Sequence, residues 1–287
     1  MSNQNQNQYI EIKNFLINKI NEEFKKTFSH DNFENHLKKS HKTDRSVVTH
    51  IDIFISKLCE TLLTQAQVQD QDQDQVQNQN SILKNYTLFS EEDEDSNRNL
   101  KFPALILDPI DGTKELSMGI GECALSFSLF NSPELSDPLN YGLIYNPFTG
   151  FTIDSLIDFT PAKNYFSDNL RGFVSITEWE RGLFHNHINK APFKRTDTNE
   201  NATATIMPVG SIAFKLGLLS AGIGDFIVSF KPKNIWDVAA GTLLASKHGF
   251  NFYEGKNHIT SLEKEKYFPP LYWCRSQDAP YIFEQYS

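Results

Sequence analysis

Apolar residues recur at every fourth position near the start of the chain. They are Ile12, Leu16, Ile20, Phe24 and Phe28. Residues four apart lie on one side of a helix, so this spacing predicts a helix with one apolar face. The segment before it is an Asn/Gln run without apolar positions, and we expect residues 1–8 to form a disordered tail.

A second set of apolar positions predicts another helix. Its members are Ile53, Ile55, Leu58, Leu62 and Leu63. Directly after it, Gln occupies every odd position from 65 to 79, and the residues between are mostly polar. A strand with this alternation would have no apolar face to bury, because successive side chains point to opposite faces. We interpret residues 65–80 as a solvated, low-complexity, Gln-rich insertion.

Short apolar runs bounded by turn residues predict strands in the middle of the chain. They cover residues 86–90, 102–107, 124–130 and 139–145. Further on, residues 211–221 and 237–247 have helical patterns on either side of a strand at 225–230, whereas 155–200 gives no clear pattern. Strands and helices mix without a regular strand–helix–strand repeat, which favours a layered α/β or α+β fold.

The composition is that of an ordinary globular protein, with 287 residues of which 39% are hydrophobic and 22% charged. Lys and Arg number 27 against 36 Asp and Glu, which gives a net charge of −9. No basic stripe is available for a phosphate backbone, and this argues against a nucleic-acid polymer as partner. A small phosphorylated substrate would therefore be bound through metal ions.

The cysteines, the first residues and the length of the apolar runs indicate the cellular compartment of the protein. Cys59, Cys123 and Cys274 are far apart and form no C-x-x-C pair, which argues against a disulfide framework and a structural zinc site. The first residues have no signal-peptide pattern, and no apolar run reaches the roughly 20 residues of a membrane span. We therefore expect a soluble, cytoplasmic protein.

The segment Asp108-Pro-Ile-Asp-Gly-Thr113 directly follows the predicted strand 102–107. Pro109 lacks an amide hydrogen, so we expect it to end the strand and to start a tight turn. Such a turn would bring both carboxylates to one side, with the Ile110 carbonyl between them. Three hard oxygen ligands in one loop suit Mg²⁺.

The same segment is also typical of a plain turn, because Asp-Pro and Asp-Gly are common turn dipeptides. Two features favour a metal site. Glu91 follows the preceding predicted strand, where a strand-end carboxylate borders an active site. Asp237 begins a predicted helix, and a capping aspartate is able to direct its second oxygen to a metal. The amides of Gly112 and Thr113 would then bind a phosphate at a helix N-terminus.

Together these residues resemble the inositol monophosphatase superfamily. The matching segments are Leu107-Asp-Pro-Ile-Asp-Gly-Thr113 with the upstream Glu91-Glu92 pair, Trp236-Asp-x-Ala-Ala-Gly241, Thr49-x-x-Asp52, Tyr141-Gly-Leu-Ile-Tyr-Asn-Pro147 and Gly210-Ser-Ile-Ala-Phe-Lys-Leu216. Members of this family are Mg²⁺-dependent, lithium-sensitive phosphomonoesterases with a layered α-β-α-β-α fold. The resemblance implies the same fold, cofactor and reaction type here.

Within the superfamily, Asp111-Gly-Thr-Lys-Glu115 is more similar to the 3′(2′),5′-bisphosphate nucleotidases of the CysQ type than to the inositol monophosphatases. The resemblance thus implies removal of the 3′-phosphate from adenosine 3′,5′-bisphosphate (PAP), which gives AMP and phosphate. An inositol monophosphatase or sugar-phosphate phosphatase is the alternative. A catalytically silent protein that binds a phosphorylated metabolite is a further one.

The resemblance also implies a role for each site residue. Two or three Mg²⁺ ions would be held by Glu91, Asp108, the Ile110 carbonyl, Asp111 and Asp237. Asp52 and Thr113 would form the catalytic pair, in which Asp52 enables the Thr113 hydroxyl to take or relay the proton of the attacking water. Substrate contacts would come from Glu91, Asp111, Gly112, Thr113, Lys114 and Asp237.

We expect two lobes around this site. Residues 9–154 would form an N-terminal α+β lobe with the metal-binding loop, and residues 155–287 a C-terminal α/β lobe that contributes Asp237 and the substrate specificity. The resemblance implies a monomer or a homodimer that acts on a small metabolite and has no membrane partner. Asp44 is interpreted as a residue that holds Lys42 or a metal-bound water, or as a loop cap, and His185-Asn-His187 as a surface loop.

Overall fold

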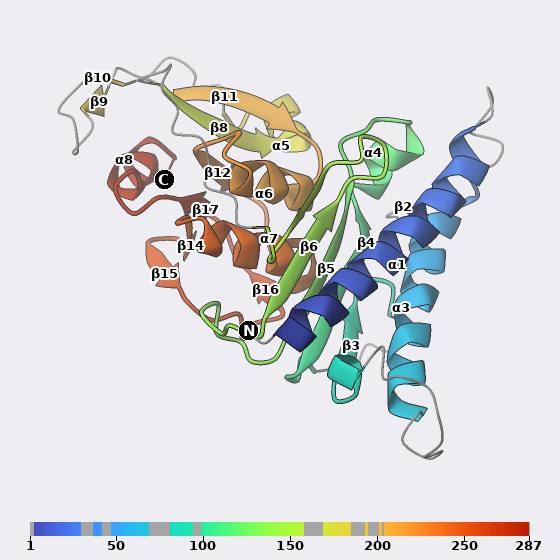
Figure 1. Cartoon of the computed structure of the whole chain (residues 1–287). Coiled ribbons are helices and arrows are strands. Elements are labelled where there is room, and N and C mark those ends of the chain that lie inside the picture. The colour runs from blue at the N-terminus through green and yellow to red at the C-terminus, as the bar shows by residue number, and fades with distance from the viewer. Residues whose placement is uncertain are drawn as a thin grey trace.

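The chain folds into layers in which helices alternate with sheets (Figure 1). Two long helices cover a five-stranded sheet, two central helices separate it from a six-stranded sheet, and a C-terminal helix covers the outer face. The predicted layered α-β-α-β-α fold is therefore confirmed. This computed structural model describes residues 3–29, 37–41, 47–68, 81–93, 99–157, 169–184, 193–194, 201–202 and 204–286.

The helices differ in length according to their layer. The two long ones are α1 (Asn3–Phe28) and α3 (His50–Val68), the two central ones are α6 (Ile212–Ser220) and α7 (Ile235–Lys247), and the outer one is α8 (Ala279–Tyr286). Shorter turns of helix are η1 (Ser81–Leu83), α4 (Thr113–Ser117) and α5 (Ile176–Glu180).

The five-stranded sheet has its strands in chain order. They are β3 (Thr87–Ser90), β4 (Ala104–Asp111), β5 (Ala124–Phe130), β6 (Tyr141–Tyr145) and β7 (Thr152–Asp154). β3 is parallel to β4, and the later pairs are antiparallel. The parallel pair brings the ends of β3 and β4 to the same edge of the sheet, which is where Glu91 and Asp108 were expected to meet.

The six-stranded sheet has the order β11-β8-β12-β17-β14-β15. Its strands are β8 (Leu170–Ser175), β11 (Ala204–Val209), β12 (Phe226–Ser229), β14 (Asn251–Glu254), β15 (Asn257–Ile259) and β17 (Leu271–Cys274). Short two-stranded pairs are β1 (Lys39–His41) with β2 (Val47–Thr49), β9 (Phe193–Lys194) with β10 (Asn201–Ala202), and β13 (Lys233–Asn234) with β16 (Lys266–Tyr267).

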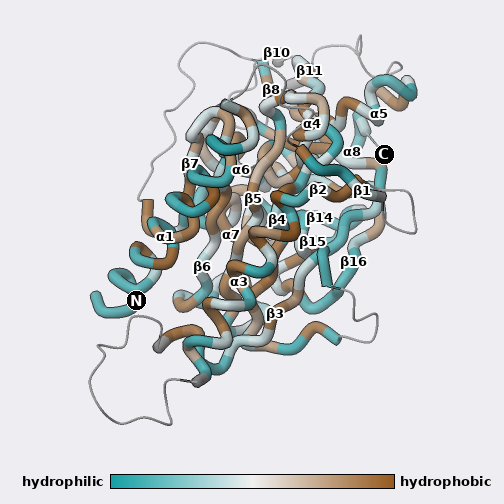
Figure 2. Tube along the Cα trace, turned by 90° about the vertical axis from the view of Figure 1, so that its right-hand side faces the viewer, coloured by the Kyte–Doolittle hydropathy of each residue, from teal (hydrophilic) through white to brown (hydrophobic). Residues whose placement is uncertain are grey.

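Strand β4 illustrates how an uninterrupted apolar run forms a buried strand. Leu105 and Leu107 pack with side chains of α1 and α3, whereas Ala104 and Ile106 pack with those of α6 and α7. Because successive side chains point to opposite faces and helices cover both faces, the whole run is buried. In Figure 2 the hydrophobic colour follows β4, while α1 alternates between brown and teal along its turns.

The central helix α7 lies very close to its neighbours. A Cβ atom added to Gly142 of β6 would lie 3.0 Å from the Ala240 carbonyl oxygen of α7. One added to Gly241 would lie 2.4 Å from the Cβ atom of Leu216 in α6. This close packing of small residues fixes α7 between the two sheets.

The disordered tail predicted over residues 1–8 is wrong from Asn3 onward, because α1 begins there. Tyr9 stacks on Tyr141 with ring centroids 4.6 Å apart, and Gln8 is buried. Once this contact fixes the helix, adding Asn and Gln residues in front of it costs far less than starting a new helix. Apolar periodicity does not report such an extension.

Other sequence predictions have mixed outcomes. The first residues of the predicted insertion 65–80 continue α3 to Val68, and the rest of it lies outside the described residues. The three cysteines form no disulfide, as expected, and all three are buried. None of the helices in the described ranges is both long and apolar enough to span a bilayer. The division into lobes at residue 154 stays a prediction, since α7 contacts strands of both sheets.

Candidate active site

A β-bulge directs Asp108 and Asp111 to the same face of β4. Asp108 lies opposite Ser126 of β5 and Asp111 opposite Ala124, so two β4 residues face a single residue of β5 between these pairs. In a regular strand, residues three apart point to opposite faces. The extra residue of the bulge restores a common face. The prediction that Pro109 ends the strand is therefore wrong. The bulge accommodates Pro109, and β4 continues to Asp111.

Asp108, Asp111 and Asp237 form a carboxylate trio. One oxygen from each lies within 4.8 Å of the others. The Asp108 side chain is 1% exposed, and its Oδ1 atom has no hydrogen-bond partner within the described structure. Burial and the charges of Glu91, Asp111 and Asp237 raise the pKa of Asp108 well above its usual value. A bound cation would relieve this repulsion, so the trio has the character of a metal site.

The carboxylate of Asp111 is held from the opposite half of the chain. Ser211 Oγ donates to Asp111 Oδ2 at 2.5 Å, and the Ala213 amide donates to the same oxygen at 2.6 Å. Ser211 is the N-cap of α6 and also accepts from the Phe214 amide. The start of α6 therefore fixes the orientation of Asp111.

The backbone that precedes α6 is fixed in turn by two charged side chains. Glu122 Oε2 accepts from the Gly210 amide at 2.7 Å. Lys215 is 2% exposed, and its ammonium donates to the carbonyls of Val209 at 2.9 Å and Gly210 at 2.5 Å. Burial, the largest cause, and the charge of Lys233 lower the pKa of Lys215 to about 7.

Asp237 was predicted to be the N-cap of its helix, but it lies at the third position of α7. The N-cap is Asn234, and its amide donates to Asp237 Oδ2 at 3.0 Å within a capping box. The helix start was predicted too late because Ile235 and Trp236 precede the recognisable aspartate. Burial, the largest cause, and the charge of Asp111 raise the pKa of Asp237 to about 7, against the opposing effect of Lys233.

Asp52 and Thr113 lie in contact beside the trio. Thr113 Oγ1 lies 2.9 Å from the Ile110 carbonyl oxygen and 3.3 Å from Asp52 Oδ1. The other oxygen of Asp52 accepts from the amide of Thr49 at 2.8 Å and from its hydroxyl at 2.5 Å. Asp52 is fully buried, which raises its pKa to about 7 although the Thr49 hydrogen bonds act in the opposite direction.

The remaining predicted site residues surround this centre. Glu91 follows β3, and its amide donates to Leu107 O at 3.1 Å, but its carboxylate is not part of the trio. Gly112 has a φ of 89°, a conformation that favours glycine. A Cβ atom there would lie 3.0 Å from Glu122 O. The side chain of Lys114 is exposed.

Sequence reasoning missed the residues that orient the carboxylates. Thr49 and Asp52 have the spacing of a capping box, so this pair was detectable locally. The bonds from Ser211 and Ala213 to Asp111 join positions about 100 residues apart in the chain, and no local pattern indicates them. Asp44 and the segment 185–187 lie outside the described residues, and their predicted roles stay predictions.

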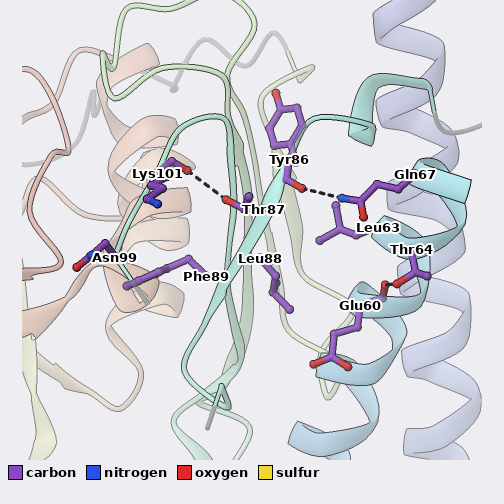
Figure 3. A pocket seen from close by; sticks show the side chains of 10 residues that line it. All are labelled: Glu60, Leu63, Thr64, Gln67, Tyr86, Thr87, Leu88, Phe89, Asn99 and Lys101. Atoms are coloured by element: carbon purple, nitrogen blue, oxygen red, sulfur yellow. Dashed lines mark hydrogen bonds between the residues drawn. The ribbon is translucent and has the colours of Figure 1, made fainter. Parts of the chain in front are cut away.

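A separate cavity of about 550 Å³ lies between α3 and the outer edge of β3 (Figure 3). Its lining includes Glu60, Gln67, Tyr86, Thr87, Phe89 and Lys101, and Gln67 Nε2 donates to the Tyr86 carbonyl oxygen at 3.4 Å. No member of the carboxylate trio lines it. The cavity therefore is not the candidate active site.

Comparisons with known proteins identify a family and a fold. The inositol monophosphatase family matches this chain over residues 5–264. A fructose-1,6-bisphosphatase from Pyrococcus furiosus is 30% identical over 154 residues, which are 50% of this chain. The aligned part spans about half the length of that relative, 53%.

Solved structures of low sequence identity share the fold. An IMPase from Thermotoga maritima has a TM-score of 0.65 at 14% identity, with 97% of this chain and 96% of that one covered. The extragenic suppressor protein suhB from Bartonella henselae has a TM-score of 0.63 at 16% identity, with 97% and 98% covered. An IMPase/NADP phosphatase, complexed with Mg²⁺ and phosphate, has a TM-score of 0.65 at 12% identity, with 98% and 95% covered.

Proposed function

The chain belongs to the inositol monophosphatase family, and from that premise we propose that it is a Mg²⁺-dependent phosphomonoesterase acting on adenosine 3′,5′-bisphosphate. Its products would be AMP and inorganic phosphate. The observation that carries the proposal is the carboxylate trio, with an unpartnered buried oxygen on Asp108, beside the contact between Thr113 and Asp52.

The residues present fit a divalent cation. The oxygens of Asp108, Asp111 and Asp237 lie within 4.8 Å of one another, and carboxylate oxygens are the ligands that Mg²⁺ prefers. The Ile110 carbonyl and Glu91 would complete the ligand set. Mg²⁺ bound there would neutralise phosphate charge and lower the pKa of a water molecule.

The Asp52–Thr113 pair would remove the proton from the attacking water. The Thr113 hydroxyl has one hydrogen, and either the Ile110 carbonyl or Asp52 Oδ1 is within reach to accept it. When the hydrogen points to Asp52, the Thr113 oxygen is free to accept from water. Because a hydroxyl alone is too weak a base, Asp52 is the final proton acceptor. Thr49 occupies the other oxygen of Asp52 and so keeps Oδ1 directed at Thr113.

The substrate phosphate would lie between the trio and the start of α4. Gly112 and Thr113 would present their amides there, and Asp237 and Lys114 would contact the rest of the substrate. Asp111, held by Ser211 and Ala213, would keep its position as charge develops on the phosphate. Such fixed polar groups stabilise a transition state because they need not reorganise during the reaction.

A side-by-side measurement of phosphate release tests this proposal. Adenosine 3′,5′-bisphosphate and inositol 1-phosphate are each assayed with Mg²⁺, with EDTA, and with Mg²⁺ plus lithium. We expect Mg²⁺-dependent, lithium-sensitive turnover that strongly favours the nucleotide. Preference for inositol 1-phosphate would retain the reaction and overturn the substrate assignment. Absence of turnover with either substrate, in folded protein that binds Mg²⁺, would favour a silent binding protein.

A sugar phosphate is the second candidate substrate. It is favoured by the 30% identity to a fructose-1,6-bisphosphatase, which extends over 154 residues. Fructose 1,6-bisphosphate is therefore a third substrate in the same assay, and faster release of phosphate from it than from the nucleotide would select this alternative.

A further inference from the structure

Four cationic side chains come from the short helices α4 and α5 and from the segment that leads into α7, which carries Asp237. They are Lys114, Arg181, Lys231 and Lys233, and together they are called the basic rim. Two of them are adjacent in sequence to site residues. Lys114 follows Thr113 on α4, and Lys233 precedes Asn234, whose amide donates to Asp237. Figures 1 and 2 both place α4 and α5 at the same end of the molecule.

The other two rim residues meet at Thr177 of α5. Lys231 Nζ donates to Thr177 Oγ1 at 3.1 Å, and the Arg181 amide donates to the Thr177 carbonyl at 3.3 Å. Glu178 fixes the same two segments, because its Oε1 atom accepts from the Phe230 amide at 2.8 Å. The hydrogen bond to Thr177 therefore fixes the ammonium of Lys231, a partly buried residue.

Electrostatic effects connect the rim to the trio. The pKa of Lys231 is lowered by burial first and then by Arg181, with further effects from Lys233 and Lys114 and an opposing effect from Glu178. Lys233 also acts on Asp237 of the trio. Lys231 thus interacts electrostatically with the other three cations, and Lys233 interacts both with Lys231 and with Asp237.

The described part of the chain does not neutralise this charge. Within it, Lys114, Arg181 and Lys233 form no ion pair with a carboxylate. Glu178 balances only part of the rim, and its carboxylate already accepts from the Phe230 amide and Ser229. A protein with a net charge of −9 therefore concentrates cations next to its candidate active site. Such an arrangement is typical of an anion-binding subsite.

We propose that the basic rim binds a second phosphate group of the substrate, while the first phosphate lies at the carboxylate trio. The preferred substrates would then be phosphomonoesters that carry another phosphate, rather than simple monophosphates. The inference rests on the proposed function for the trio. It assigns specificity to Arg181 and Lys231, which lie outside the family motifs of the sequence.

The test compares substrates with one and two phosphates. The pairs are adenosine 3′,5′-bisphosphate with adenosine 3′-phosphate, and fructose 1,6-bisphosphate with fructose 1-phosphate. The variant is Arg181→Gln/Lys231→Gln, which leaves Lys114 and Lys233 in place beside the trio. The control is Lys57→Gln/Lys256→Gln, which removes the same charge at two exposed positions elsewhere.

We expect the rim variant to raise KM for the preferred bisphosphate by about ten- to hundredfold, because charge-assisted hydrogen bonds are lost. KM for the matching monophosphate would change by less than about twofold, as would both values in the control variant. The nucleotide and sugar pairs show which bisphosphate the site prefers. Equal effects on bisphosphate and monophosphate, or equal KM values in the unmodified protein, would overturn the inference.

A binding measurement separates this inference from the proposed function. Inorganic phosphate is titrated in EDTA and followed by phosphorus NMR, so that neither metal nor turnover contributes. We expect phosphate to bind the unmodified protein and the control variant, and not the rim variant. Retention of this difference without any phosphatase activity would contradict the proposed function alone. Equal phosphate binding by all three proteins would contradict the proposed role of the basic rim as a phosphate-binding subsite.

Discussion

The carboxylate trio and the basic rim are neighbours of opposite charge that are held in different ways. Asp111 and Asp237 accept hydrogen bonds of 2.5 to 3.0 Å from groups fixed by helix starts. In the rim, Lys231 has one short side-chain contact, to Thr177, and Lys114 and Arg181 are exposed. A reaction centre needs fixed geometry, whereas recognition of a remote anion tolerates longer and more mobile side chains. We therefore expect substitutions in the two regions to affect different kinetic constants.

The largest effect is expected from Asp111→Asn. Loss of a trio carboxylate would reduce kcat/KM for every substrate by about a thousandfold, equivalent to about 4 kcal/mol of transition-state stabilisation. Removal of one repelling charge would also raise the melting temperature of the metal-free protein. The measurements are turnover of both substrate pairs and thermal unfolding in EDTA. Loss of turnover with the bisphosphates alone would contradict the separate roles of the trio, which acts on every substrate, and the rim, which acts on bisphosphates.

The next effect is expected from Asp52→Asn, which removes the proton acceptor. General-base catalysis contributes about a hundred- to ten-thousandfold, and we expect a loss in kcat within that range. KM should change little, and steady-state kinetics measures both constants. The matched control is Asp137→Asn, at a surface turn where the carboxylate accepts from Ser132, and it should leave kcat unchanged.

The raised pKa of Asp52 gives this variant a pH signature. The pKa is about 7 in the folded protein and near the ordinary value of 3.8 in the unfolded chain, so between these values the folded protein holds a proton that the unfolded chain has lost. Stability therefore falls as pH rises from about 4 to about 7, and activity falls as pH drops below about 7. Asp52→Asn should lack this contribution to the stability slope, as measured by thermal unfolding across that range. An unchanged slope would contradict the burial of an ionisable Asp52.

A smaller effect is expected from Ser211→Ala, because Ser211 only orients Asp111. Loss of such a supporting hydrogen bond weakens metal binding by about ten- to hundredfold. The Mg²⁺ concentration for half-maximal activity should rise, whereas kcat at saturating Mg²⁺ should be largely restored. Ser246→Ala, near the far end of α7, is the matched control. A fall in kcat that Mg²⁺ does not restore would assign Ser211 a direct catalytic role.

The smallest effect is expected from Gln67→Ala in the cavity between α3 and β3. The hydrogen bond from Gln67 to the Tyr86 carbonyl is long at 3.4 Å. We expect turnover to stay within about twofold and stability within about 0.5 kcal/mol. A strong loss of turnover would show that this cavity participates in the reaction. The cavity would then be a third functional region beside the trio and the rim.

The fold was predictable from sequence where the signal is local. The apolar runs at β4, β5 and β6 and the helical patterns at α6 and α7 lie where they were expected. The strand order was not predictable, because β17 lies between β12 and β14 although it follows both in the chain. Pairing of this kind depends on contacts between distant segments. The start of α1 was missed for a similar reason, since Tyr9 packs on Tyr141.

The candidate site was predictable in its residue types and less so in its geometry. Asp108, Asp111 and Asp237 were singled out from their motifs, and the structure brings them together. Their supports were missed, because the bonds from Ser211 and Ala213 join segments about 100 residues apart in the chain. Arg181 was missed as well, since it lies in a stretch without a clear pattern and meets the rest of the rim only in the folded chain.

The bulge in β4 has a consequence for protein design. The segment Asp108-Pro-Ile-Asp-Gly112 would not form the site if it were grafted alone onto another protein, because on an evenly paired strand its two carboxylates would point to opposite faces. One of them would then enter a hydrophobic layer, and Ile110 would share a face with Asp108. The transferable unit is the string together with its offset partner strand β5, so a scaffold chosen to receive this site must already contain the same irregular pairing.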